Sequence, residues 1–117
     1  MKNIKIIQAY TKQYANPILL NVGDVVFLGK EETEEKWKGW IWAELKNKTN
    51  AGWIPKQIIE FSEDGISGII IKKYSAKELT VQMNDQVELL ETLNGWCWVK
   101  NNKTKEEGWI PSECTIL

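Results

Sequence analysis

Two copies of one Trp-rich pattern follow each other along the chain. The segment Gly39-Trp40-Ile41-Trp42 recurs as Gly95-Trp96-Cys97-Trp98, and Gly52-Trp53-Ile54-Pro55 recurs as Gly108-Trp109-Ile110-Pro111. Both recurrences have the same spacing, and Trp is rare enough that three Trp–Trp matches in register are hard to attribute to chance. The chain must therefore be able to build one small fold twice.

Matches upstream of the Trp motifs extend the repeat over nearly the whole chain. Residues 18–28 align with residues 79–89, and Tyr10 aligns with Tyr74. The offset between the copies changes because the first copy has a longer first loop and a longer Glu-rich loop. Surface connections are where such insertions are expected.

The repeat predicts two consecutive domains. They cover residues 1–61 and residues 69–117, and the polar, Gly-containing segment 62–68 between them is the predicted linker. Its length is too short to separate the two domains widely. A domain of about 60 residues buries only roughly 60% of the surface of its unfolded chain, so each domain would be of marginal size.

Short runs of β-forming residues between turn residues predict an all-β fold. Val, Ile, Phe and Trp cluster in residues 24–29, 40–45 and 86–90. The polar segments 46–50 and 101–105 are predicted hairpin tips. No segment has a sustained period of 3.6 residues, so at most single helical turns are expected. We predict two small five-stranded barrels in tandem.

Alternation along the strands assigns side chains to the two faces of each barrel. Small apolar side chains are predicted to point inward, and Trp side chains to point outward, where Trp42 would lie across from Trp53. These Trp either bind a partner or bury the contacts of the barrels themselves. The inward set is Ile41, Ala43, Leu45, Ile54, Cys97 and Val99, and the outward set is Trp40, Trp42, Trp53, Trp96, Trp98 and Trp109.

The composition excludes several kinds of active site. The chain has no His and no Arg, two Cys, and 15 Lys against 16 acidic residues, for a formal net charge of -1. A Ser-His-Asp triad, a His metal site and a four-Cys zinc site are therefore impossible, and the basic field that nucleic acid requires is absent. We predict a protein that is not an enzyme, uses no cofactor or metal and binds no nucleic acid.

Membrane and export signals are also missing from the sequence. No run approaches the roughly 18 apolar residues of a membrane span, and residues 1–12 lack the apolar segment of a signal peptide. Cys97 and Cys114 make no disulfide framework, which fits a reducing compartment. We predict a cytoplasmic protein, with Cys97 as a buried, inert thiol and Cys114 as a partly exposed one.

The order of the motifs resembles the Src homology 3 (SH3) family, and most closely the variant SH3 domains found in tandem in small bacterial proteins. The most specific elements are Gly23-Asp24, Trp40 and Gly52-Trp53-Ile54-Pro55, together with their repeats. The resemblance covers nearly the whole chain twice. It implies two SH3-like barrels.

The resemblance also implies a peptide-binding groove in each copy. Members of the family bind extended peptides, often in polyproline II form, on a shallow aromatic surface. The first Tyr position of that surface holds Gln8 and Lys72, and the last Tyr position holds Ile58 and Cys114. The implied partial grooves are Tyr10, Trp40, Pro55 and Ile58 in the first copy, and Tyr74, Trp96, Pro111 and Cys114 in the second.

A Glu-rich loop distinguishes the first copy from the second. Residues 31–35 contain four Glu and precede Trp40 and Trp37, which has no counterpart in the second copy. These carboxylates either steer basic peptide segments toward the Trp side chains or form a solvated loop that aids solubility. Trp37 is expected to be the most exposed Trp and part of the binding surface. If one copy binds a partner better, we expect it to be the first.

Three functions fit these observations. The first is a non-enzymatic adaptor that binds a protein or peptide, possibly a basic one, through its two barrels. The second is a cell-wall module of a hydrolase that recognises peptidoglycan, against which the missing export signal weighs. The third is a regulatory subunit that buries its Trp surface in a larger partner.

Overall fold

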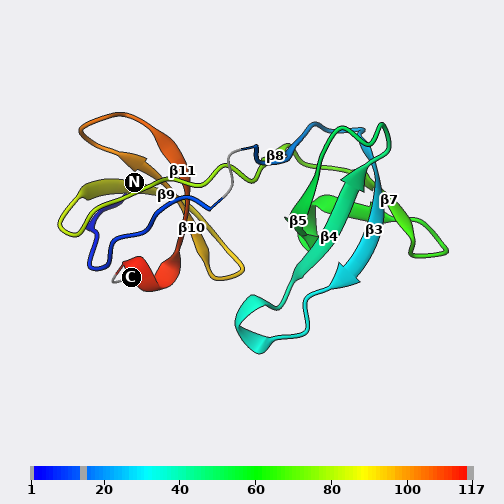
Figure 1. Ribbon diagram of the computed structural model, residues 1–117, viewed down its shortest axis with the longest axis horizontal. Coiled ribbons are helices and arrows are strands. Elements are labelled where there is room, and N and C mark those ends of the chain that lie inside the picture. The colour runs from blue at the N-terminus through cyan, green and yellow to red at the C-terminus, as the bar shows by residue number, and fades with distance from the viewer. Residues whose placement is uncertain (1, 14–15, 116–117) are drawn as a thin grey trace. The chain divides into compact units, whose positions relative to one another are not determined.

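The computed structural model describes residues 2–13 and 16–115, and β-strands make up most of them (Figure 1). Helical structure in these residues is limited to three single 3-10 turns, which confirms the all-β prediction. The strands are β1 (Lys2–Lys5), β2 (Leu19–Leu20), β3 (Val25–Glu31), β4 (Trp40–Leu45), β5 (Ala51–Pro55), β6 (Ile59–Phe61), β7 (Ser67–Ile70), β8 (Tyr74–Ser75), β9 (Gln86–Leu93), β10 (Trp96–Asn101) and β11 (Glu107–Pro111), and the turns are η1 (Glu35–Trp37), η2 (Lys56–Ile58) and η3 (Ser112–Cys114).

The chain divides into two compact units, but their boundaries differ from the predicted ones. One unit combines residues 1–16 with residues 77–117 and is called the terminal barrel below. The other consists of residues 17–76 and is called the central barrel. The predicted domains 1–61 and 69–117 are therefore not the packed units, because the chain passes from one unit to the other twice.

The central barrel takes its strands from both copies of the repeat. Its five-stranded sheet has the order β5-β4-β3-β7-β6, and β2 pairs with β8 in a second, two-stranded sheet. Strands β7 and β8 belong to the second copy, and the remaining strands belong to the first. Val25 lies opposite Ile69 where β3 meets β7.

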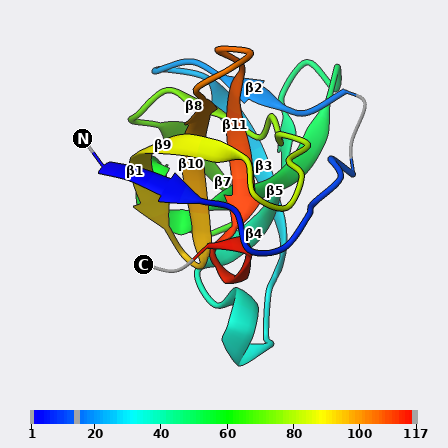
Figure 2. The same ribbon diagram turned by 90° about the vertical axis from the view of Figure 1, so that its left-hand side faces the viewer.

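The terminal barrel also takes its strands from both copies, mainly from the second. Its sheet has the order β1-β9-β10-β11, in which β1 alone comes from the first copy (Figure 2). Lys5 lies opposite Gln86 where β1 meets β9. The first copy continues alongside the second as far as Tyr10, whose N–H donates to the carbonyl of Val81 over 2.9 Å.

The two copies have exchanged their first strands reciprocally. In the terminal barrel Ile6 N–H donates to the carbonyl of Asp85, and in the central barrel Ile70 N–H makes the equivalent bond to Asp24, both over 2.9 Å. Ile6 and Ile70 occupy the same position in the repeat, and so do their acceptors Asp85 and Asp24. Each first strand therefore makes with the other copy the hydrogen bond that its own copy could equally offer.

A tight turn accounts for the exchange. The predicted linker is in fact the reverse turn between β6 and β7, which pair with each other as a hairpin. Within the turn Ser62 Oγ–H and Ile66 N–H both donate to Oδ1 of Asp64, bonds that lower the pKa of that carboxyl. Gly65 supplies the positive φ of 72°. The hairpin brings β7 directly onto the barrel that β6 has completed, and β1 fills the position left on the other copy.

The packing confirms most of the predicted inward residues. Ile41, Ala43, Ile54, Cys97 and Val99 are all buried, whereas Leu45 is partly exposed. The predicted hairpin tips also form, with Lys48 and Lys105 in left-handed conformation. The core of the terminal barrel consists of Ile4, Ile6, Leu79, Val81, Val87, Cys97, Val99, Ile110 and Cys114.

The exchange predicts which barrel loses stability when a first strand is weakened. Ile6 and Ile70 are both fully buried, so replacing either by Ala should cost about 2–5 kcal/mol of unfolding free energy. We expect Ile6→Ala to accelerate hydrogen exchange at the amides of β10, and Ile70→Ala to accelerate it at those of β4. Faster exchange at β4 in Ile6→Ala would contradict the exchanged topology.

Candidate functional site

The terminal barrel holds a pair of aromatic rings from different copies of the repeat. The rings of Tyr10 and Trp96 meet edge to face, with their centroids 6.0 Å apart and their planes at 82°. Backbone bonds to Val81 fix Tyr10, and Trp96 begins β10 opposite Pro111 on β11. Tyr10 and Trp96 are both only half-buried, so part of each ring is accessible.

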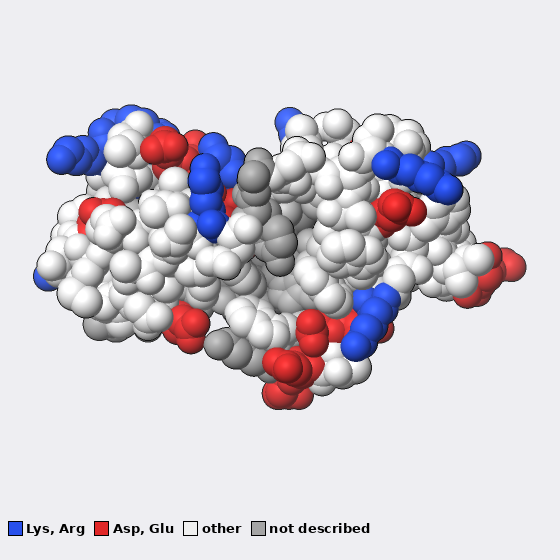
Figure 3. All heavy atoms as spheres, viewed as in Figure 1, with Lys and Arg blue, Asp and Glu red and all other residues white. Residues whose placement is uncertain are grey.

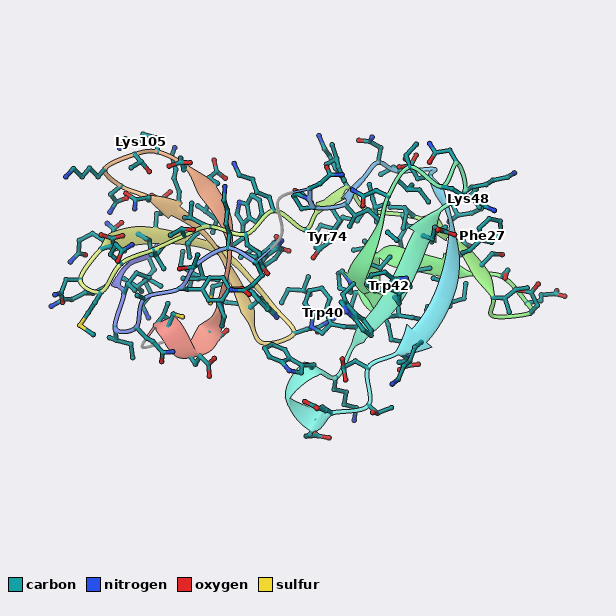
Figure 4. The ribbon with its side chains drawn as sticks, viewed as in Figure 1. Phe27, Trp40, Trp42, Lys48, Tyr74 and Lys105 are labelled. Atoms are coloured by element: carbon teal, nitrogen blue, oxygen red, sulfur yellow. The ribbon has the colours of Figure 1, made fainter. Side chains whose placement is uncertain are left out.

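The central barrel holds the equivalent pair, Trp40 on β4 and Tyr74 on β8 (Figure 4). The ring centroids are 6.4 Å apart and the planes are tilted by 57°. Pro55 lies opposite Trp40 in the register of β4 and β5. Trp40 and Tyr74 each expose only 7% of their surface, so Trp40 is buried although its strand face was predicted to be outward.

The structure therefore groups the predicted site residues differently from the sequence order. Tyr10 was predicted to share a groove with Trp40 and Pro55, and Tyr74 to share one with Trp96. Instead, each Tyr lies beside the Trp of the other copy. We call each aromatic site composite, because its Tyr follows the exchanged first strand of one copy and its Trp belongs to the other copy.

The residues in the last groove position do not line a surface. Ile58 exposes 4% and Cys114 exposes 1%, and Cys114 belongs to the core of the terminal barrel, so its predicted partial exposure is wrong. Burial raises the pKa of the Cys114 thiol, with smaller contributions from Glu113 and Cys97. Cys97 is a buried free thiol, as predicted. Pro55 and Pro111 are buried as well, so the aromatic rings are the parts of each predicted groove that can contribute surface.

The other Trp residues form two cross-strand pairs. Trp42 meets Trp53 edge to face with centroids 5.6 Å apart, which confirms the predicted pairing. Trp98 and Trp109 make the same contact at 5.3 Å, and Trp98 Nε1–H donates to Oε1 of Glu107. Trp109 exposes only 5% of its surface, so it is a packing residue and not an outward one.

The Glu-rich loop lies between β3 and β4, where acidic side chains gather in Figure 3. One of the carboxylates, Glu31, is paired with Lys56 at 2.7 Å. Trp37 ends the 3-10 turn η1 in this loop and is half-buried. The expectation that Trp37 is the most exposed Trp is therefore wrong, since Trp42 exposes 40% of its surface.

Metal-binding clusters and membrane-spanning helices were sought in the part of the chain that the structure describes. Residues 2–13 and 16–115 contain no cluster of three or more side chains that could hold a metal ion. Among the same residues no helix has the length and apolarity that a membrane crossing needs.

Two family matches cover the chain in the order of its repeats. The family described as "Variant SH3 domain" matches residues 4–62, and the family described as "SH3 domain" matches residues 72–112. The chain belongs to the SH3 family. No curated protein and no solved structure matches it. Two SH3 domains in tandem make this chain a protein-interaction module, in which the two family matches each span a part of both barrels.

The composite sites can be tested through the energetic coupling of their rings. An edge-to-face pair contributes about 0.5–1.5 kcal/mol beyond the area that it buries. We expect a double-mutant cycle of Tyr10→Ala and Trp96→Ala to show coupling of this size in the opening free energy of the β10 amides. The cycle of Tyr10→Ala and Trp40→Ala should be additive within about 0.5 kcal/mol. Coupling of Tyr10 to Trp40 instead of Trp96 would contradict the structure.

Proposed function

We propose that this SH3 protein is a non-enzymatic adaptor that binds extended peptide segments of partner proteins at its two composite aromatic sites. In each site a Tyr and a Trp from different copies of the repeat stand beside a Pro. Flat rings of this kind pack against an extended ligand that is already ordered and loses little conformational entropy on binding. The two buried free thiols, Cys97 and Cys114, fit a protein of a reducing compartment such as the cytoplasm.

The observation that carries the proposal is the accessibility of the Tyr10–Trp96 pair. Both rings are half-buried, whereas Trp40 and Tyr74 expose 7% each. Part of each ring of the terminal barrel is therefore accessible to a ligand. This reverses the expectation that the site with Trp40 binds better.

The charges near the two sites suggest basic peptides as partners. Glu31, Glu34 and Glu35 are exposed in the loop that precedes Trp40, and Glu113 is exposed on the turn η3 that follows Pro111. Acidic side chains at the rim attract basic segments and exclude acidic ones more than they add affinity. Because Ile58 and Cys114 are buried, each site offers less aromatic surface than the family's full groove. Binding at one site should accordingly be weak, and two sites on one chain can raise the avidity for a repeated ligand.

An amide-shift titration tests the proposal with the peptide Lys-Pro-Leu-Pro-Pro-Leu-Pro-Lys. We expect the indole N–H signal of Trp96 and the amide signals around Tyr10 to move on addition of the peptide. Trp96→Ala should abolish these shifts, whereas Trp40→Ala should leave them in place. The same peptide with Glu in place of Lys serves as the charge control and should bind more weakly.

The absence of any shift at about 1 mM peptide would mean a binding free energy weaker than about -4 kcal/mol and would contradict the proposal. Shifts that survive in Trp96→Ala would place the binding surface elsewhere. Retention of the protein on purified peptidoglycan, with no response to the peptide, would favour the cell-wall alternative.

A further inference from the structure

The outer face of the central barrel differs in character from the same face of the terminal barrel. Val25 and Phe27 on β3 and Ile69 on β7 point away from the core, where their neighbours Val26 and Ile70 are fully buried. Phe27 exposes 42% of its surface and Ile69 exposes 47%. Val25 lies directly opposite Ile69, so these side chains form one continuous apolar patch.

The internal repeat supplies a control for this observation. In the terminal barrel the positions of Val25, Phe27 and Ile69 are occupied by Gln86, Glu88 and Lys5. There Glu88 lies opposite Lys100, a pair of opposite charges on a solvated face. The fold therefore does not require apolar side chains at these positions. An apolar patch that is present in the central barrel and replaced by polar residues in the terminal barrel is typical of an interaction surface.

Trp42 extends the patch across a further strand. A Cβ atom built on Gly29 would lie 3.1 Å from Cδ1 of Trp42, so the indole lies over the backbone of β3 next to Phe27. Figure 4 marks Phe27 and Trp42 on the neighbouring strands β3 and β4. We call Val25, Phe27, Trp42 and Ile69 together the outer patch.

The size of the outer patch indicates a weak interface. Taking roughly 200 Å² for a large apolar side chain, the exposed fractions of Phe27, Trp42 and Ile69 leave about 80–100 Å² each. The patch is then about 300 Å², within the range of the largest apolar patches on soluble proteins, which are often functional. Two such patches together fall below the roughly 1,200 Å² of a standard stable interface.

The charges around the outer patch favour a second copy of this chain as the occupant. Glu44 lies opposite Phe27 and Glu60 lies opposite Ile69 in the strand register. The exposed Lys46 follows β4, and its N–H donates to the carbonyl of Val25. A rim with both signs complements itself in a two-fold arrangement, whereas a charged peptide would be matched by a rim of one sign. A net charge of -1 adds little repulsion between copies.

We propose that the outer patch is a homodimer interface, in which the central barrels of two chains pack their sheets face to face. Phe27 and Ile69 lie at its centre, and Lys46, which follows β4, faces Glu60 on β6 of the other copy, at the opposite edge of its patch. This interface goes beyond the proposed peptide binding, because it does not use Tyr10, Trp96 or the other residues of the aromatic sites.

Sedimentation equilibrium of the full chain from about 10 μM to about 1 mM tests the proposal. We expect the average mass of the wild type to rise from one copy toward two, as for a weak, rapidly reversible dimer. Phe27→Glu and Ile69→Lys install the residues of the terminal barrel at these positions, so the fold should tolerate them. Each should raise the dimer Kd at least about tenfold. Glu88→Gln, on the corresponding face of the terminal barrel, should leave the Kd unchanged.

Three results would overturn the proposal. One is a wild type that stays monomeric up to about 1 mM, far above the concentrations of a specific weak dimer. Another is a Phe27→Glu or Ile69→Lys variant that keeps the dispersed amide spectrum of the folded chain and dimerises like the wild type. A dimer that forms only after unfolding and refolding would point to strand exchange between chains and would also exclude the patch.

Discussion

The hairpin between β6 and β7 is the constraint on which the rest of the structure depends. The turn between them, residues 62–66, could span at most about 17 Å even when fully extended. A reverse turn stabilised by Asp64 and Gly65 folds these residues back, so that β7 pairs directly with β6. Both copies of the repeat offer the same partners to a first strand, so local pairing alone does not choose between them. The short turn favours pairing of β7 with β6, because closing a short loop costs little chain entropy. The exchange of β1 follows from that choice.

The make-up of the aromatic sites follows from the exchange of the first strands. Since each first strand carries a Tyr into the other copy's barrel, neither aromatic site can be assembled from one copy alone. A change in the first strand of one copy therefore acts on the site that contains the Trp of the other. Each barrel combines parts of both SH3 matches, although the family matches follow each other in the sequence.

The two barrels have diverged on their surfaces while keeping their cores. Ile6 and Ile70 fill equivalent buried positions, and the Trp42–Trp53 and Trp98–Trp109 pairs have nearly the same geometry. Outside, Phe27 stands where the other barrel has Glu88. Core positions are constrained by packing volume, so they stay alike. Surface positions are less constrained by packing, so the outer faces of the two barrels differ.

The sequence by itself determined the elements of this protein. Alternation with period two and the recurring Gly-Trp motifs predicted the strands, the inward Ala43 and Val99, and the family, because these depend on local chemistry and on the repeat. Which strand pairs with which copy was decided only by the tertiary structure. The strands β1 and β7 occupy equivalent positions in the two barrels, and their partners β9 and β3 are distant in sequence. For the same reason the pairing of Tyr10 with Trp96, and the burial of Trp40 and Cys114, could not be read from a pattern of neighbours. The shortness of segment 62–68 was the one available signal, and its meaning depends on the antiparallel contact between β6 and β7 that the fold creates.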